Sequence, residues 1–230
     1  MGRKAALATG LGAAAVALVL LGQGVPRLIA AAYTAPYDQT LRDLGDARHP
    51  RDISPGELSE AAESRRQALA WHDSARTRTE FGAARMMQAS RDDYEGTRGR
   101  ILLDQSIEAH RDALARRPAD SHTWTRLARL LLVRDGLTPG IVPYLRMAIR
   151  TAPSDPRLIF ARLDLAFMAW PMMDNTTRAL IAEQIRIAAR TKTKAFARLV
   201  KERFALEIAR EALKDDIGLQ RRFDAYYSHL

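Results

Sequence analysis

Hydrophobic residues follow two different patterns along the chain, and the change comes near residue 34. Residues 5–22 are mostly Ala, Leu, Val and Gly and carry no charge, and they are preceded by Arg3 and Lys4. This run of about 18 residues approaches the roughly 20 that cross a bilayer. Beyond residue 34, apolar residues recur every three or four positions, the period of an amphipathic helix, and no strand pattern is convincing. The pattern predicts an all-α protein that begins with an apolar helix.

The first 33 residues are either a removed signal peptide or a retained membrane anchor. Residues 30–32 are all alanine and offer a cleavage site, but Pro26 and Arg27 separate them from the apolar run. We therefore expect residues 1–33 to form a retained signal-anchor, or transmembrane, helix. Because Lys and Arg are held on the cytoplasmic side, the basic start predicts a cytoplasmic N-terminus and a helical domain outside the cytoplasmic membrane.

The helical domain is expected to begin after a tether. Residues 34–53 are polar and contain two prolines, which is typical of an extended linker. The sequence Ser54-Pro55-Gly56-Glu57 is a capping box with proline at the first helical position, so a helix starts there and residues 54–230 form the domain. Further helices are expected from about residue 74 to a break at 90–99, and then at about 100–116, 156–170, 175–190, 193–213 and 217–227. The longest, 193–213, carries Phe196, Leu199, Val200, Phe204 and Ile208.

An approximate repeat lies in the middle of this domain. Residues 113–120 resemble residues 148–155 at an offset of 35, with a proline in equivalent places. A period close to 34 with proline at the turn is typical of tetratricopeptide arrays. The residues expected to pack this repeat are Trp124, Leu127, Ala128, Tyr144 and Ala148, with Pro118 and Pro153 at its turns. Gly136 would make the internal turn and Thr138-Pro139 would cap the second helix, in whose opening turn Pro143 is irregular.

The clearest repeat spans residues 107–155 and loses its Trp/Leu signature after Pro153. The expected architecture is therefore an irregular, tetratricopeptide-like (TPR-like) α-solenoid behind the membrane anchor.

Composition limits the chemistry. The chain has no cysteine, which excludes disulfides, thiol catalysis and Cys-ligated metals. Its net charge is +9, and all but five of its 36 basic residues are arginines, scattered singly or in pairs such as Arg65-Arg66. Acids at helical spacing from many of them, such as Asp112 before Arg116, predict salt-bridged helix surfaces. We expect no nucleic-acid binding, which needs a concentrated basic stripe with aromatic residues. Attraction to a membrane surface or a polyanionic polymer fits the charge better.

No catalytic motif is present, and the five histidines are scattered. We read His72-Asp73 as a surface pair and His110 as a packing residue, and we predict no catalytic residue, no metal site and no cofactor. The alternative is a glycan-acting enzyme, which uses two carboxylates. Asp164, on an otherwise apolar helix, is the acid that this alternative would use. It would have to be unpaired beside a second carboxylate, and a partner such as Arg129 or Arg162 would argue against it.

The densest apolar cluster is centred on Trp170. Core packing is the default interpretation of these side chains. The alternative is a partner surface, because Trp and Met are enriched at interfaces. The residues that would form it are Phe167, Trp170, Met172 and Met173.

Several segments together resemble a known family. They are the anchor, the TPR-like centre, the stretch from Pro153-Ser-Asp-Pro-Arg-Leu to Trp170-Pro-Met-Met-Asp174, and then Arg178 and Gln184-Ile185-Arg186. Over about residues 100–190 the chain resembles the exopolysaccharide biosynthesis accessory family of the Vibrio type.

The resemblance implies a non-catalytic accessory role in polymer assembly or export, with the helical domain in the periplasm and the anchor in the bacterial inner membrane. The implied partners are the proteins of a polysaccharide assembly or export complex, with an anionic polysaccharide as an additional candidate. The resemblance supplies no site residues. The alternative within the same class is an anchored periplasmic TPR adaptor for cytochrome maturation or envelope protein assembly.

Overall fold

The computed structural model describes residues 3–45 and 52–230, with side chains from Gly12 onward except at residues 13, 44 and 45. Over these residues the chain is all-helical and has no strand, as the sequence predicts. It divides into two compact units, Met1–Ala109 and His110–Leu230.

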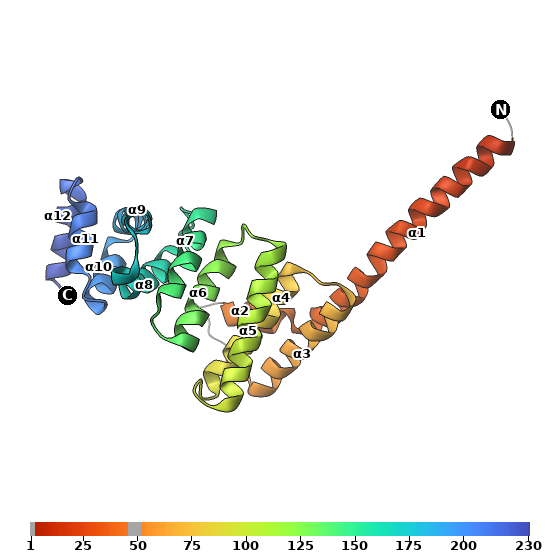
Figure 1. Ribbon diagram of the computed structural model, residues 1–230, viewed down its shortest axis with the longest axis horizontal. Helices are drawn as coiled ribbons and strands as arrows, with labels where there is room; N and C mark the ends of the chain where they lie inside the picture. Colours follow the sequence, from red (N-terminus) through yellow and green to blue (C-terminus); the bar gives the residue numbers. More distant parts are fainter. Residues whose placement is uncertain (1–2, 46–51) are drawn as a thin grey trace. The chain divides into compact units, whose positions relative to one another are not determined.

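The first unit begins with one long helix, α1 (Arg3–Thr34), which continues through Pro26. Figure 1 shows its N-terminal part extending away from the other helices of this unit, while its C-terminal part lies along the third helix. Its apolar side chains are exposed, and Leu18, for example, is 70% exposed. α1 is long and apolar enough to span a membrane, a property that signal sequences share.

The residues after α1 are helical rather than extended. A 3-10 turn, η1 (Ala35–Tyr37), leads into α2 (Asp38–Gly45). The prediction of an extended tether is therefore wrong for residues 35–45, and its last part at 46–51 lies outside the described residues. Pro36 is compatible with η1 because it stands at the start of the turn, where no amide donor is needed.

Two helices follow that the sequence signals place correctly. In α3 (Pro55–Trp71) the capping box is complete, since Ser54 Oγ accepts from the Glu57 amide at 3.2 Å and Glu57 Oε2 accepts from the Ser54 amide at 2.8 Å. α4 (Ala75–Arg91) has Ser74 as its N-cap. The two helices pack closely, and the buried apolar residues on them are mainly alanines, which allow such an approach.

A break lies within the predicted range 90–99, because α4 ends at Arg91 and α5 (Thr97–Arg116) begins at Thr97. α5 extends into the second unit. Gly99 is required in its first turn, since a Cβ there would lie 2.1 Å from the Asp93 carbonyl oxygen.

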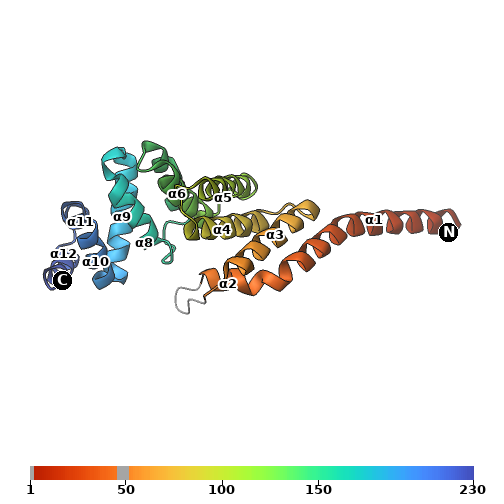
Figure 2. The ribbon, with the colours of Figure 1, turned by 90° about the horizontal axis from the view of Figure 1, so that it is seen from below.

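The second unit stacks helices in sequence order. They are α6 (Ser121–Asp135), α7 (Val142–Thr151), α8 (Ile159–Ala169), α9 (Asn175–Thr191), α10 (Thr193–Glu202), α11 (Leu206–Leu213) and α12 (Ile217–Ser228). Each of α6 to α9 packs on the next, and α6 also contacts α8 as α7 contacts α9. Figure 2 shows α8, α9 and α10 side by side. The buried side chains between these helices form the core of this unit.

Two short 3-10 turns modify the predicted helices here. η2 (Pro139–Ile141) precedes α7, and Thr138 makes no side-chain cap hydrogen bond, so the predicted Thr138-Pro139 cap is wrong. Pro143 lies at the start of α7, a position that tolerates proline. The predicted helix 156–170 is shorter, because α8 starts at Ile159 and η3 (Trp170–Met172) follows it around Pro171.

The single helix predicted at 193–213 is two helices. α10 ends in a Schellman motif, in which the Ala205 amide donates to the Val200 carbonyl at 3.0 Å and the Phe204 amide to the Lys201 carbonyl at 3.3 Å. Phe204 therefore takes the left-handed position, with φ of 53°, and is 94% exposed. The prediction that Phe204 lies inside a helix is wrong, because it stands between α10 and α11.

Candidate functional site

The described residues of the first unit contain a fully buried arginine, Arg65, that fastens α1 to α3 and α4. Its guanidinium donates to Asp38 Oδ1 at 2.5 Å, to Glu80 Oε2 at 3.2 Å and to the Thr34 carbonyl at 3.0 Å. A fourth hydrogen bond, at 3.1 Å, goes to Ser64 Oγ. Thr34 is the last residue of α1, so this one side chain joins the end of the apolar helix, α2 and two helices of the unit.

The composition alone predicts Arg65 to be one of many surface arginines. A signal was nevertheless present, because position 65 follows Leu58, Ala61 and Ala62 at the spacing of the buried helix face. An arginine in an apolar stripe indicates either an exposed stripe or a buried ion pair. Which of the two applies at position 65 depends on Asp38 and Glu80, because these carboxylates lie on two other helices, α2 and α4.

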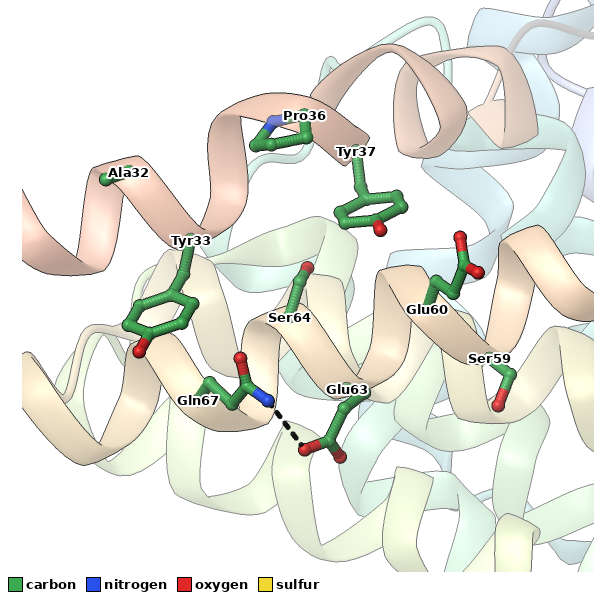
Figure 3. Close-up of a pocket in the computed structure, with 9 residues that line it drawn as sticks. All are labelled: Ala32, Tyr33, Pro36, Tyr37, Ser59, Glu60, Glu63, Ser64 and Gln67. Carbon is green, nitrogen blue, oxygen red and sulfur yellow. Dashed lines mark hydrogen bonds between the residues drawn. The ribbon is translucent and has the colours of Figure 1, made fainter.

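A cavity of about 430 Å³ lies beside this junction, between the C-terminal part of α1 and α3. Figure 3 shows Tyr33 and Tyr37 above the polar side chains of α3, where Gln67 Nε2 donates to Glu63 Oε1 at 3.1 Å. The cavity is part of the junction between the apolar helix and the rest of this unit.

The four residues of the predicted partner surface around Trp170 differ in their exposure to solvent. Phe167 and Met173 are buried in the core, which agrees with the default interpretation of core packing and not with the alternative of a partner surface at these two residues. Trp170 and Met172 are half-buried. Trp170 lines a groove of about 360 Å³, and the Arg178 guanidinium lies 5.3 Å from its ring centre.

The residues predicted to pack the repeat lie between or beside α6 and α7. Leu127, Ala128 and Ala148 are fully buried, and the rings of Trp124 and Tyr144 are 5.9 Å apart. The two turn prolines, Pro118 and Pro153, are exposed. The carbonyls of both prolines accept a side-chain hydrogen bond, at 2.7 Å from Trp124 Nε1 and at 2.6 Å from Gln184 Nε2. The turns are thus fixed by similar bonds from different residues.

A second buried arginine, Arg162, stands where the offset of 35 places Leu127 of the preceding repeat. It donates to the Ala152 carbonyl at 2.9 Å, to Gln184 Oε1 at 3.3 Å and to Ser121 Oγ. Burial lowers the pKa of Arg162 to about 10. The charge is held by the carbonyl end of α7, where helices carry partial negative charge.

Asp164 is paired rather than isolated. Arg203 Nε donates to its Oδ1 at 2.6 Å, and Arg129 Nη1 lies 3.7 Å from its Oδ2. The glycan-acting alternative required an unpaired Asp164, so this carboxylate does not support it. His72 is half-buried and His110 fully buried. Within the described part of the chain, no group of three or more His, Asp or Glu side chains could hold a metal ion.

Known families offer no match: no family model fits the sequence, and no curated protein is significantly similar to it.

Proposed function

We propose that this protein is a membrane-anchored, non-catalytic adaptor of the TPR-like class that acts in exopolysaccharide assembly or export. The observation that carries the proposal is the Arg65 junction. It makes the apolar α1 continuous with a packed helical unit instead of leaving it on a loose tether. A helical body held rigidly at one end of a membrane helix suits a protein that positions others at the membrane surface.

Two features of the second unit support the repeat part of the proposal. Helices contact both their neighbours and the helices after those, as stacked repeats do. Leu127 and Ala128 are fully buried, and the ring of Trp124 lies 5.9 Å from that of Tyr144, which supports their assignment as packing residues of a repeat. The polysaccharide role depends on the resemblance over residues 100–190 alone. The groove beside Trp170 is the proposed contact for a protein partner.

The test is co-purification of the full-length tagged protein in mild detergent, followed by mass spectrometry. The control lacks residues 1–24 and keeps Val25–Thr34, because the end of α1 belongs to the Arg65 junction. We expect polysaccharide polymerase, co-polymerase or export components with the full chain and fewer with the control. Haem-handling or envelope-assembly proteins would favour the alternative adaptor role, and a monomer without partners would refute an adaptor.

Membrane topology is tested separately, and the absence of cysteine makes this simple. A Ser228→Cys variant places one thiol on the exposed end of α12. We expect a membrane-impermeant maleimide to label it in intact spheroplasts. Labelling only after lysis would place the helical domain in the cytoplasm.

A further inference from the structure

One cavity of the second unit is lined by basic side chains. It lies at the junction of α9 and α10, beside α12, and has a volume of about 560 Å³. The side chains that define it are Thr191, Lys192, Thr193, Lys194, Arg198 and Tyr226. The two cavities along α1 and the groove beside Trp170 each include acidic side chains, whereas this one is lined by three cations and no acid.

The cations of this cavity are available to a ligand. Lys194 and Arg198 are one helical turn apart on α10, so they share a side of the helix. Both are exposed, and neither forms an ion pair with any described residue. Elsewhere in the same unit, Arg157 and Arg210 lie 2.9 and 3.1 Å from aspartates. The Lys192 ammonium lies 5.9 Å from the centre of the Phe160 ring.

An aromatic ring adds to this arrangement. Lys192 stands at the junction of two helices, as the C-cap of α9 and the N-cap of α10. Because the partial charges of these two helix ends are opposite, the preference for an anion comes from the side chains. Tyr226 is 44% exposed and presents its ring at the same cavity. Cations and an exposed aromatic ring together suit a ligand that has both a negative charge and an apolar ring face.

We propose that this cavity binds an acidic saccharide, with a uronate carboxylate at Lys194 and Arg198 and the sugar ring against Tyr226. The cavity is within the range of roughly 300–1,000 Å³ that is common for small-ligand sites. The choice of a saccharide rests on the proposed role in exopolysaccharide assembly, while the preference for an anion rests on the charge of the cavity. The protein would thus hold the polymer itself as well as the proteins that make it.

The test measures ligand binding to the purified full-length protein by titration calorimetry in non-ionic detergent. The probe is a galacturonate hexamer, and the comparisons are maltohexaose, inorganic phosphate and phosphatidylglycerol in mixed micelles. The site variant is Lys194→Gln/Arg198→Gln. The matched control, Arg150→Gln/Arg221→Gln, removes the same charge from exposed positions outside the cavity of the same unit. Tyr226→Ala is compared with Tyr226→Phe, which keeps the ring, and circular dichroism checks that each variant is folded.

We expect the galacturonate hexamer to bind more tightly than maltohexaose and more weakly as salt is raised, because exposed charges are screened. The site variant should raise the Kd for the galacturonate hexamer about 5- to 10-fold, because it removes two partly exposed ion pairs with the ligand. The control variant should raise this Kd about 2-fold or less. Tyr226→Ala should weaken binding while Tyr226→Phe does not. Equal loss in site variant and control, equal binding of maltohexaose, or site-dependent binding of phosphate or phosphatidylglycerol instead would overturn the proposal. Because partners are not in the assay, such a failure leaves the co-purification result unaffected.

Discussion

Replacement of Arg65 by methionine tests how the apolar helix is held. Arg65 is fully buried and joins two carboxylates and the last carbonyl of α1. Removing one member of a buried ion pair costs about 3–5 kcal/mol, because the remaining charges lose their partner. The side chains of Asp38 and Glu80 are 29% and 22% exposed, so water can reach them, and Glu80 keeps an ion pair with Arg76 at 2.7 Å. We therefore expect the lower end of this range, about 3 kcal/mol.

The neighbouring residue supplies the control. Arg66 is 61% exposed and pairs with Glu63, also exposed, at 2.5 Å. Exposed pairs contribute about 0.2–1 kcal/mol, so Arg66→Met should cost no more than that. In a unit of about 100 residues, 1 kcal/mol corresponds to about 4–8 °C in Tm, and Arg65→Met should lower the Tm of the first unit by about 12–24 °C.

The assay is thermal unfolding in detergent, followed by circular dichroism, with hydrogen exchange to locate the change. In Arg65→Met, the rate of amide hydrogen exchange should rise in peptides from residues 30–43 and 55–71. In Arg66→Met, the rate in these peptides should stay unchanged. If the two variants lose equal stability, or if exchange in these peptides does not rise, Arg65 does not fasten α1 and the rigid-anchor argument fails.

Two further predictions concern the second unit. Phe204→Gly should be more stable than Phe204→Ala by about 1 kcal/mol in urea unfolding, because a non-glycine residue is strained at a φ of 53°; equal stability would contradict the Schellman turn. The Arg157 guanidinium beside Asp155 holds the pKa of that carboxyl well below its usual range. A lowered pKa contributes stability above the unfolded pKa of about 3.9 and loses it as pH falls through the folded value. Asp155→Asn should therefore be less stable than wild type at pH 7, and the gap should shrink as pH falls from about 5 to 2; a gap that is constant with pH would refute this.

Features whose cause is local in the sequence were predictable. The Ser54 capping box is confirmed, and α4 and α9 begin near residues 74 and 175 as expected, because a helix start needs only a polar side chain and an amide three residues later. The apolar run of α1 and the all-helical class follow from residue spacing in the same way.

Features that depend on distant partners were missed. Neither glycine nor proline marks the end of α10, where Phe204 takes the position that glycine usually fills. The burial of Arg65 depends on Asp38 and Glu80, which lie on two other helices. The unpaired state of Lys194 and Arg198 likewise becomes visible only when the residues around them are placed.

The arginine excess of this chain has a structural use that its composition does not reveal. Arg65 donates to the carbonyl of Thr34 at the end of α1, Arg162 to that of Ala152 after α7, and Arg186 to that of Ala212 in the last turn of α11. The last carbonyls of a helix have no partner within it and carry partial negative charge, so a guanidinium from another helix both pairs and neutralises them.

Lysine would serve poorly in these places, since a guanidinium has five donors in a fixed plane and can bond a carbonyl and further groups together. The count of 36 basic residues therefore overstates the cations that an anionic partner can reach, because several of them are committed to helix ends and to ion pairs. An anionic partner should respond to exposed cations that such bonds leave free, and the cavity gathers two of them, Lys194 and Arg198, beside an exposed aromatic ring. That cavity, and not the overall charge, is therefore the place to test for an anionic partner.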